Sequence, residues 1–96
     1  MSVISVIRIH CHSGRGRELQ QALAKPMAVT RDNPDCSRIE LFSNPDDPDD
    51  WVLLEDWSSE AAHHQHVDNL NAEKILDAAS AVMADVDSPH YAPTGL

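Results

Sequence analysis

The sequence predicts an α+β fold in which helices cover one face of an antiparallel sheet. Three observations support this prediction. Residues 3–10 and 51–57 are rich in β-branched, aliphatic and aromatic side chains, which favour strands. Residues 15–31 instead repeat apolar side chains at helical spacing. A further strand-like segment, residues 37–43, is separated from 51–57 by a polar stretch, which predicts a hairpin.

The first strand and the first helix follow from residue type and spacing. Residues 3–10 are mostly β-branched, so a buried strand is expected. In the helix predicted at 15–31, the apolar face comprises Leu19, Ala22, Leu23, Met27 and Thr30. Pro26 lies inside this segment and has no N–H to donate, so we expect a kink or a break there.

The hairpin predicted next has a strongly acidic connection. Its first strand, at 37–43, places Ile39 and Leu41 on one face. The connection at 44–50 contains two prolines and four aspartates and is expected to be a solvated loop. Clustered carboxylates suit Ca²⁺, but this loop lacks the glycine and the bidentate glutamate of a dedicated calcium site. We therefore expect no calcium ion there.

Residues 51–57 predict the central strand, because both of its faces carry apolar side chains. A period of two places one set of side chains on the same face: Trp51, Leu53, Glu55 and Trp57. The other face carries Val52, Leu54 and Asp56. Both faces are therefore expected to be at least partly covered, with the Glu55 carboxylate lying between two indole rings.

A short helix is expected directly after this strand. Ser58 or Ser59 can cap its N-terminus, and Glu60 suits the positive end of the helix dipole. Helical spacing places His66 on the same face as Ala62, near the end of the strand that carries Glu55.

The remaining residues predict one more helix and one more strand. A break is expected at residues 68–69, followed by a helix over residues 70–83. Residues 86–91 predict a last short strand, which Pro89 restricts to a sheet edge or a bulge. The chain is thus predicted as a single domain over residues 1–96, with a tail from about residue 92.

This order of elements is the split β-α-β arrangement of ferredoxin-like folds, with a four-stranded antiparallel sheet. In that topology the helices cover one face, and no element remains to cover the other. The apolar residues on both sides of the first and central strands therefore predict a second copy packed sheet to sheet. A homodimer is expected.

Composition limits the class of partner. The formal net charge of −9 disfavours nucleic acid and anionic membrane surfaces as partners, so a small, neutral or weakly ionised molecule is expected. No apolar run reaches the roughly 18 residues of a membrane span, and the N-terminus does not resemble a signal peptide, so a cytoplasmic location is expected. The two cysteines, Cys11 and Cys36, are expected to be free thiols.

Several motifs together resemble one family. Residues 51–66 contain Glu55-x-Trp57-x-Ser59-x-Ala61-x4-His66, preceded by Gly16-Arg-Glu-Leu19, by Lys25-Pro26 and by Thr30-Arg-Asp-Asn-Pro-Asp-Cys36. This pattern resembles the antibiotic biosynthesis monooxygenase family, which includes quinol monooxygenases and small actinomycete enzymes that oxidise polyketide anthrones. The similarity extends over most of the chain. Asp35 stands where the family usually has glycine, so a reshaped turn is expected there.

The resemblance implies a dimeric α/β barrel and, as in some members, oxygenation without flavin, haem or metal. Haem-degrading members use an asparagine on the first strand, with a tryptophan and a histidine on later helices. Here the first strand has no asparagine, and His66 and Leu76 occupy the other two positions, so haem degradation is disfavoured. Two alternatives stay open: an isomerase or degrading enzyme for a small enolisable ligand, and a non-catalytic ligand-binding dimer.

Three residues are candidates for the site. Cofactor-free oxygenation requires a phenol or enol that loses a proton, so the protein must supply a base and an apolar pocket. His66 is the candidate base, and its alternative role is to tie the helix to the sheet. Trp57 could stack on a planar substrate or belong to the core. Glu55 could be a pocket acid or the ion-pair partner of Arg8 or Arg38.

Histidine pairs also raise the question of a metal site. His63 and His66 lie one helical turn apart, and His10 and His12 share a strand face, but neither pair has an evident third ligand. We therefore expect no metal, with His63 at a solvated edge and His66 directed inward. The family resemblance, together with these candidate residues, implies an oxidoreductase that acts on a quinol, anthrone or related phenolic compound with molecular oxygen and without a cofactor.

Overall fold

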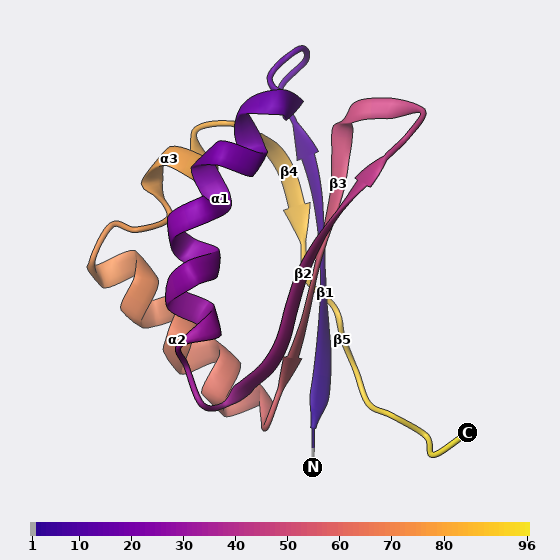
Figure 1. Cartoon of the computed structure of the whole chain (residues 1–96), viewed down its shortest axis with the longest axis vertical. Coiled ribbons are helices and arrows are strands. Elements are labelled where there is room, and N and C mark those ends of the chain that lie inside the picture. The colour runs from indigo at the N-terminus through magenta and orange to yellow at the C-terminus, as the bar shows by residue number, and fades with distance from the viewer. Residues whose placement is uncertain (1) are drawn as a thin grey trace.

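A computed structural model describes residues 2–96 and contains one antiparallel sheet with all helices on one side (Figure 1). In chain order the elements are β1 (Val3–Cys11), α1 (Gly16–Arg31), β2 (Cys36–Asn44), β3 (Asp47–Trp57), α2 (Glu60–Ala72), α3 (Asp77–Ser80), β4 (Met83–Asp87) and β5 (His90–Tyr91). The strand order is β2-β3-β1-β4, and β5 also pairs with β1. The predicted α+β, ferredoxin-like fold is confirmed.

The two central strands, β1 and β3, direct alternate side chains into the space beneath the helices. Their register pairs Ser5 with Glu55 and Ile9 with Trp51. The buried core combines residues of these two strands with others from α1, from α3 and from the turn before β4. Its members are Ile9, Cys11, Leu19, Leu23, Met27, Leu53, Ala79 and Val82. Both cysteines are buried free thiols, as predicted.

The start of α1 is fixed by the β2–β3 hairpin. The carboxylate of Asp49 accepts hydrogen bonds from the backbone N–H of Gly14, at 3.0 Å, and of Gly16, at 2.8 Å. The bond from Gly16 occupies an N–H group of the first turn that the helix cannot pair internally. A Cβ atom at Gly16 would lie 1.8 Å from the carbonyl oxygen of Pro48, so only glycine allows this approach. Of the kink or break predicted at Pro26, the break does not occur, because the helix continues through Pro26 to Arg31.

The acidic connection is much shorter than predicted. Only Pro45 and Asp46 form the turn, because β3 already begins at Asp47. The prediction of a solvated loop over 44–50 is wrong because the aspartates act as hydrogen-bond acceptors within the hairpin. Asp50, for example, accepts a bond of 2.9 Å from the side-chain amide of Asn44.

The helix after β3 is longer than predicted. Helix α2 passes through residues 68–69 without a break, since both residues lie on its exposed face. It ends in a Schellman motif: Lys74 adopts a φ of 59°, and the N–H of Ile75 bonds to the carbonyl of Leu70 at 3.0 Å. Only the four residues of α3 remain helical in the segment predicted as a long third helix.

The C-terminal strand is also divided. Strand β4 begins at Met83, and β5 follows after Pro89, whose carbonyl accepts a bond of 3.0 Å from the N–H of Val6. Both segments pair with β1, so the fourth position of the sheet is filled by two short strands instead of one.

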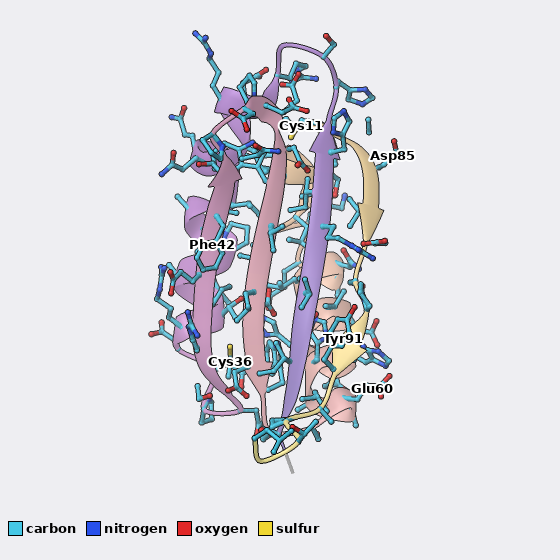
Figure 2. All side chains as sticks on the ribbon, turned by 90° about the vertical axis from the view of Figure 1, so that its right-hand side faces the viewer. Cys11, Cys36, Phe42, Glu60, Asp85 and Tyr91 are labelled. Atoms are coloured by element: carbon cyan, nitrogen blue, oxygen red, sulfur yellow. The ribbon has the colours of Figure 1, made fainter. Side chains whose placement is uncertain are left out.

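The face of the sheet opposite the helices is directed toward the viewer in Figure 2. Its central side chains are apolar and only partly buried: Ile4, Val6, Val52 and Leu54. Phe42 and Tyr91, on the outer strands, are 40% and 55% exposed. Arg8 lies on this face and forms an ion pair of 2.8 Å with Asp87. An apolar strip therefore runs across the sheet, and no helix or strand of the described residues covers it.

Among residues 2–96, none of the helices has both the length and the apolar character that crossing a membrane requires.

Substitution of Gly16 tests the contact between α1 and the hairpin. We expect Gly16→Ala to lower the free energy of unfolding by about 1–3 kcal/mol, because the added methyl group collides with the Pro48 backbone. Chemical denaturation measures this change. Gln20→Ala, at an exposed position of the same helix, is the control. Equal stability of the two variants would contradict the proposed contact.

Candidate active site

A cavity of about 300 Å³ lies between the sheet and the helices. Most of its wall is formed by apolar side chains from β1, β2, β3, α1 and α2. These are Ile7, Ile9, Leu23, Pro26, Met27, Ile39, Leu53, Val67 and Leu70. Val86, which is half exposed, and Ser88, which is exposed, also line it, so the cavity reaches solvent along the β4 edge. It is an apolar compartment of the size of a small-ligand site.

Glu55 is the only acidic side chain that lines this cavity among the described residues. It projects from β3 toward the helices, between Ser5 on β1 and Ile39 on β2. Its carboxylate oxygen Oε1 accepts a hydrogen bond of 2.7 Å from the indole Nε1 of Trp57. Burial raises the pKa of Glu55, and the bond from Trp57 opposes this rise only in part.

The predicted alternative for Glu55, an ion pair with Arg8 or Arg38, is wrong. Arg8 lies on the opposite face and pairs with Asp87, and the Arg38 guanidinium contacts Glu40 at 3.0 Å. The helix-facing position of Glu55 in the pleat keeps it away from both arginines. Its carboxylate therefore has no cationic side chain within ion-pair distance except His63, if that ring is protonated.

Trp57 supports the site from beneath. Its side chain is fully buried and is not part of the cavity wall. The ring centroid lies 5.2 Å from that of His63, in a stacked arrangement, and 5.0 Å from that of His66. Trp57 thus positions the Glu55 carboxylate and two imidazole rings.

His66 lines the cavity, and both of its ring nitrogens have partners. Thr30 donates its hydroxyl hydrogen to the carbonyl of Pro26, so its Oγ1 accepts from Nε2 of His66 at 2.8 Å. The amide oxygen of Asn33 accepts from the backbone N–H of Asp35, so its Nδ2 donates to Nδ1 of His66 at 3.2 Å. His66 is therefore neutral, with its hydrogen on Nε2, and burial lowers its pKa.

Asp35, where the sequence predicted a reshaped turn, helps to hold this end of the site. Its backbone does not adopt a positive φ. The carboxylate accepts the Ser58 hydroxyl at 2.9 Å, and the Asp35 carbonyl accepts the Ser58 N–H at 2.8 Å. Ser59 then caps α2 by accepting the N–H of Ala62 at 3.0 Å, as predicted for this serine pair.

His63 does not lie at a solvated edge, contrary to the prediction. It is 4% exposed, because His63, His66 and Leu70 share the buried face of α2. Its Nδ1 forms a hydrogen bond of 2.8 Å with Nε2 of His90 on β5. Its Nε2 is buried without a hydrogen-bond partner and lies 3.7 Å from Oε1 of Glu55. Burial, followed by the nearby histidines, lowers the pKa of His63 to about 4.

The site therefore combines one buried carboxylate with two neutral imidazoles in an apolar cavity. Sequence reasoning identified Glu55, Trp57 and His66 as neighbours, and the structure brings them together. It missed His63, although the spacing of three residues to His66 was a usable signal. It also missed His90, which no local pattern connects to α2. Among the described residues, those that could hold a metal ion are Glu60, His64 and His90, which lie outside the cavity.

Comparisons with known proteins agree with this architecture. A family model described as antibiotic biosynthesis monooxygenase matches residues 2–91. SnoaB, a cofactor-independent oxygenase from Streptomyces nogalater, has a similar structure, with a TM-score of 0.83 and 18% identity over 96% of this chain and 92% of that chain. A putative antibiotic biosynthesis monooxygenase from Nitrosomonas europaea gives a TM-score of 0.85 and 15% identity, covering 97% of this chain and 90% of that one. No curated protein matches the sequence at a significant level.

The buried His63 predicts a loss of stability in acid. In the unfolded chain its pKa returns to about 6.5, whereas in the folded chain it is about 4, so only the unfolded chain is protonated between these values. The free energy of unfolding should therefore fall as the pH is lowered through this window, by at most about 1.4 kcal/mol per pH unit for this group. The lowered pKa of His66 also makes the free energy of unfolding fall in acid, whereas the raised pKa of Glu55 opposes this fall.

Denaturation curves at several pH values isolate the part due to His63. His63→Phe should reduce the slope of stability against pH, while keeping a ring over Trp57 and facing the same neighbours, Glu55 and His90. His12→Phe, at an exposed position outside α2, should leave the slope unchanged. Identical slopes for wild type and His63→Phe would show that His63 is not held neutral by burial.

Proposed function

Because the chain belongs to the antibiotic biosynthesis monooxygenase family, we propose that it is a cofactor-independent monooxygenase of a small planar quinol, anthrone or related phenolic compound. The observation that carries this proposal is the buried Glu55 carboxylate in the wall of an apolar cavity. The similarity to SnoaB, described as a cofactor-independent oxygenase, supports the reaction class.

The cavity favours a compact and mainly apolar substrate. Its volume of about 300 Å³ lies at the lower end of the usual range for ligand sites, roughly 300–1,000 Å³. Aliphatic side chains form most of the wall, and a flat aromatic ring can fill the space between sheet and helices. The few polar groups, Glu55, His63 and His66, can orient a phenolic or carbonyl oxygen.

Glu55 is the base that the geometry favours. Its carboxylate is buried beside the cavity and accepts one bond, from Trp57, which leaves acceptor capacity for a substrate proton. The sequence suggested His66, but both nitrogens of that ring already hold hydrogen bonds to Thr30 and Asn33. His66 can serve as the base only after one of these bonds breaks. In the proposal Trp57, which lies outside the cavity wall, positions Glu55 through its hydrogen bond to the carboxylate.

The reaction balances without a cofactor. Glu55 removes a proton from the substrate, and the resulting anion transfers one electron to dioxygen. The substrate radical and superoxide combine to form a C–O bond, and the peroxide takes up the proton held by Glu55. Loss of a second substrate hydrogen and cleavage of the O–O bond release water. For a carbon with two hydrogens the sum is CH₂ + O₂ → C=O + H₂O.

In this proposal the protein acts as a homodimer. The apolar strip on the open face of the sheet, with Phe42 and Tyr91 beside it, needs a cover, and no helix or strand among residues 2–96 lies over it (Figure 2). A second copy supplies a surface of the same shape and character through a twofold axis. Two sheets packed face to face would then form the dimeric α/β barrel.

Oxygen uptake by purified protein tests the proposed reaction. With a panel of quinols and anthrones, we expect uptake of one dioxygen per product formed, unchanged by a chelator and without added flavin. An isomerase or degrading enzyme for an enolisable ligand would begin with the same proton transfer but consume no oxygen. A ligand-binding dimer would saturate without forming product. Either outcome would replace the oxygenase proposal.

Matched variants assign the base in the same assay. Glu55→Gln keeps an oxygen for the Trp57 bond and should lower turnover by roughly 10²- to 10⁴-fold with the fold intact. His66→Ala should instead cost about 1–3 kcal/mol of stability, with little change in activity per folded molecule. His12→Ala, at an exposed position, is the control. Full activity of Glu55→Gln would remove Glu55 as the base, and a turnover loss in stable His66→Ala would restore His66 to that role.

Sedimentation of two charge variants tests the dimer. The wild type should sediment as a dimer at micromolar concentration. Leu54→Asp places a charge in the apolar strip and should yield monomers, because burying an unpaired carboxylate is costly. Arg17→Asp, at an exposed position of α1, should remain dimeric. A folded wild-type monomer at this concentration would contradict the sheet-to-sheet assembly.

A further inference from the structure

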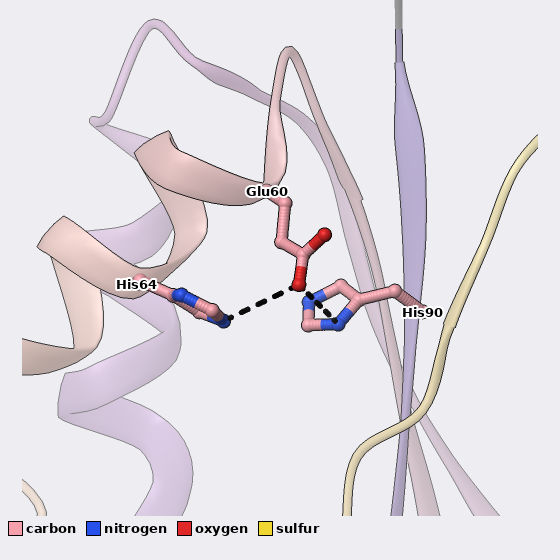
Figure 3. Close-up of side chains that lie close together, drawn as sticks. All are labelled: Glu60, His64 and His90. Atoms are coloured by element: carbon pink, nitrogen blue, oxygen red, sulfur yellow. Dashed lines mark ion pairs between the residues drawn. The ribbon is translucent and has the colours of Figure 1, made fainter.

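A second group of polar side chains lies next to the cavity but outside it. Glu60 and His64 come from adjacent turns of α2, and His90 comes from β5 across the edge of the sheet (Figure 3). One carboxylate oxygen, Oε1 of Glu60, lies 3.8 Å from Nε2 of His64 and 3.8 Å from Nδ1 of His90. One ligand atom from each of the three residues lies within 4.8 Å of the others. None of the three lines the cavity.

The donor set matches the preferences of zinc. Two imidazoles and one carboxylate are zinc ligands with bonds of about 2.0–2.2 Å, which places ligand atoms roughly 3.4 Å apart in a tetrahedron. The observed 3.8 Å separations are close to this value. Glu60 and His64 are exposed and can turn to close the remaining gap. Three protein ligands leave the fourth position to water.

The position of His90 provides an independent sign of a metal site. A histidine that ligates a metal through one nitrogen usually donates the N–H of the other nitrogen to a fixed acceptor. With Nδ1 directed at Glu60, the other nitrogen of His90, Nε2, lies 2.8 Å from Nδ1 of the buried His63. The contact with His63 thus fixes the orientation of the His90 ring, as a second hydrogen bond does for histidines that ligate a metal.

This contact also connects the cluster to the cavity. A metal on Nδ1 of His90 requires the ring hydrogen to be on Nε2, where it is donated to Nδ1 of His63. His63 must then carry its own hydrogen on Nε2. That atom is buried, has no other partner, and lies 3.7 Å from Oε1 of Glu55. A bound ion would therefore fix the tautomer of His63 and direct an N–H toward the Glu55 carboxylate.

We propose that Glu60, His64 and His90 form a binding site for a divalent transition-metal ion of the zinc class, and that the ion orients His63 toward Glu55. The charge of the protein favours such a ligand, since a formal net charge of −9 attracts cations. The metal site is tested by binding alone, so it can stand or fail independently of the oxygenase proposal, which requires turnover without metal.

Calorimetric titration of chelator-treated protein with Zn²⁺ tests the site. Wild type should bind one ion per chain, and His64→Gln and Glu60→Gln should each weaken binding by at least tenfold. Both changes are at exposed positions, so the variants should fold. His12→Gln, which removes an exposed histidine elsewhere, should bind as wild type does. Equal binding by wild type and His64→Gln, or no binding at 100-fold molar excess of Zn²⁺, would overturn the proposal.

Nitrogen NMR of the histidine rings tests the connection to the cavity. Zn²⁺ should convert His63 to a single tautomer with its hydrogen on Nε2 in wild type but not in His64→Gln. The spectrum of His66, whose tautomer Thr30 and Asn33 already fix, should not change. Binding of Zn²⁺ without any change at His63 would contradict the proposed orientation of that ring.

Discussion

The buried carboxylate of Glu55 is the constraint on which the rest of this structure depends. A carboxylate in an apolar wall is costly, and here it receives one hydrogen bond, from the Trp57 indole at 2.7 Å. No arginine or lysine compensates its charge, because Arg8 and Arg38 pair elsewhere. Such an under-compensated group is rarely kept for stability alone, and it suits a proton acceptor.

The surrounding elements hold this carboxylate in place and keep water away. Strand β3 is central, so Glu55 is flanked by strands on both sides. The Ser59 cap starts α2 directly after β3, which brings His63 and His66 over the Trp57 ring. Thr30 on α1 and Asn33 in the following turn bond to His66 and so connect α1 to α2. Both helices and the sheet line the small cavity beside Glu55.

Much of this arrangement was predictable from sequence because local patterns determine it. A period of two placed Glu55 and Trp57 on one face, and the adjacent cap placed His66 nearby. The errors arose where distant groups decide the outcome. The hairpin aspartates bond to Asn44 and to the start of α1, and the polar residues 68–69 lie on the exposed face of a continuous helix. His63 is buried and forms a hydrogen bond with His90 of β5. Sequence spacing carries no information about His90, which pairing with β1 brings to α2.

A direct titration of Glu55 tests the central claim. Carbon NMR of the labelled side-chain carboxyl should give a pKa above the usual value for glutamate, about 4.3, because burial dominates its environment. Trp57→Phe removes the bond that stabilises the charged form, so the pKa should rise further in this variant. A Glu55 that titrates at the ordinary value, unaffected by Trp57→Phe, would show that the carboxylate is solvated and would contradict the account.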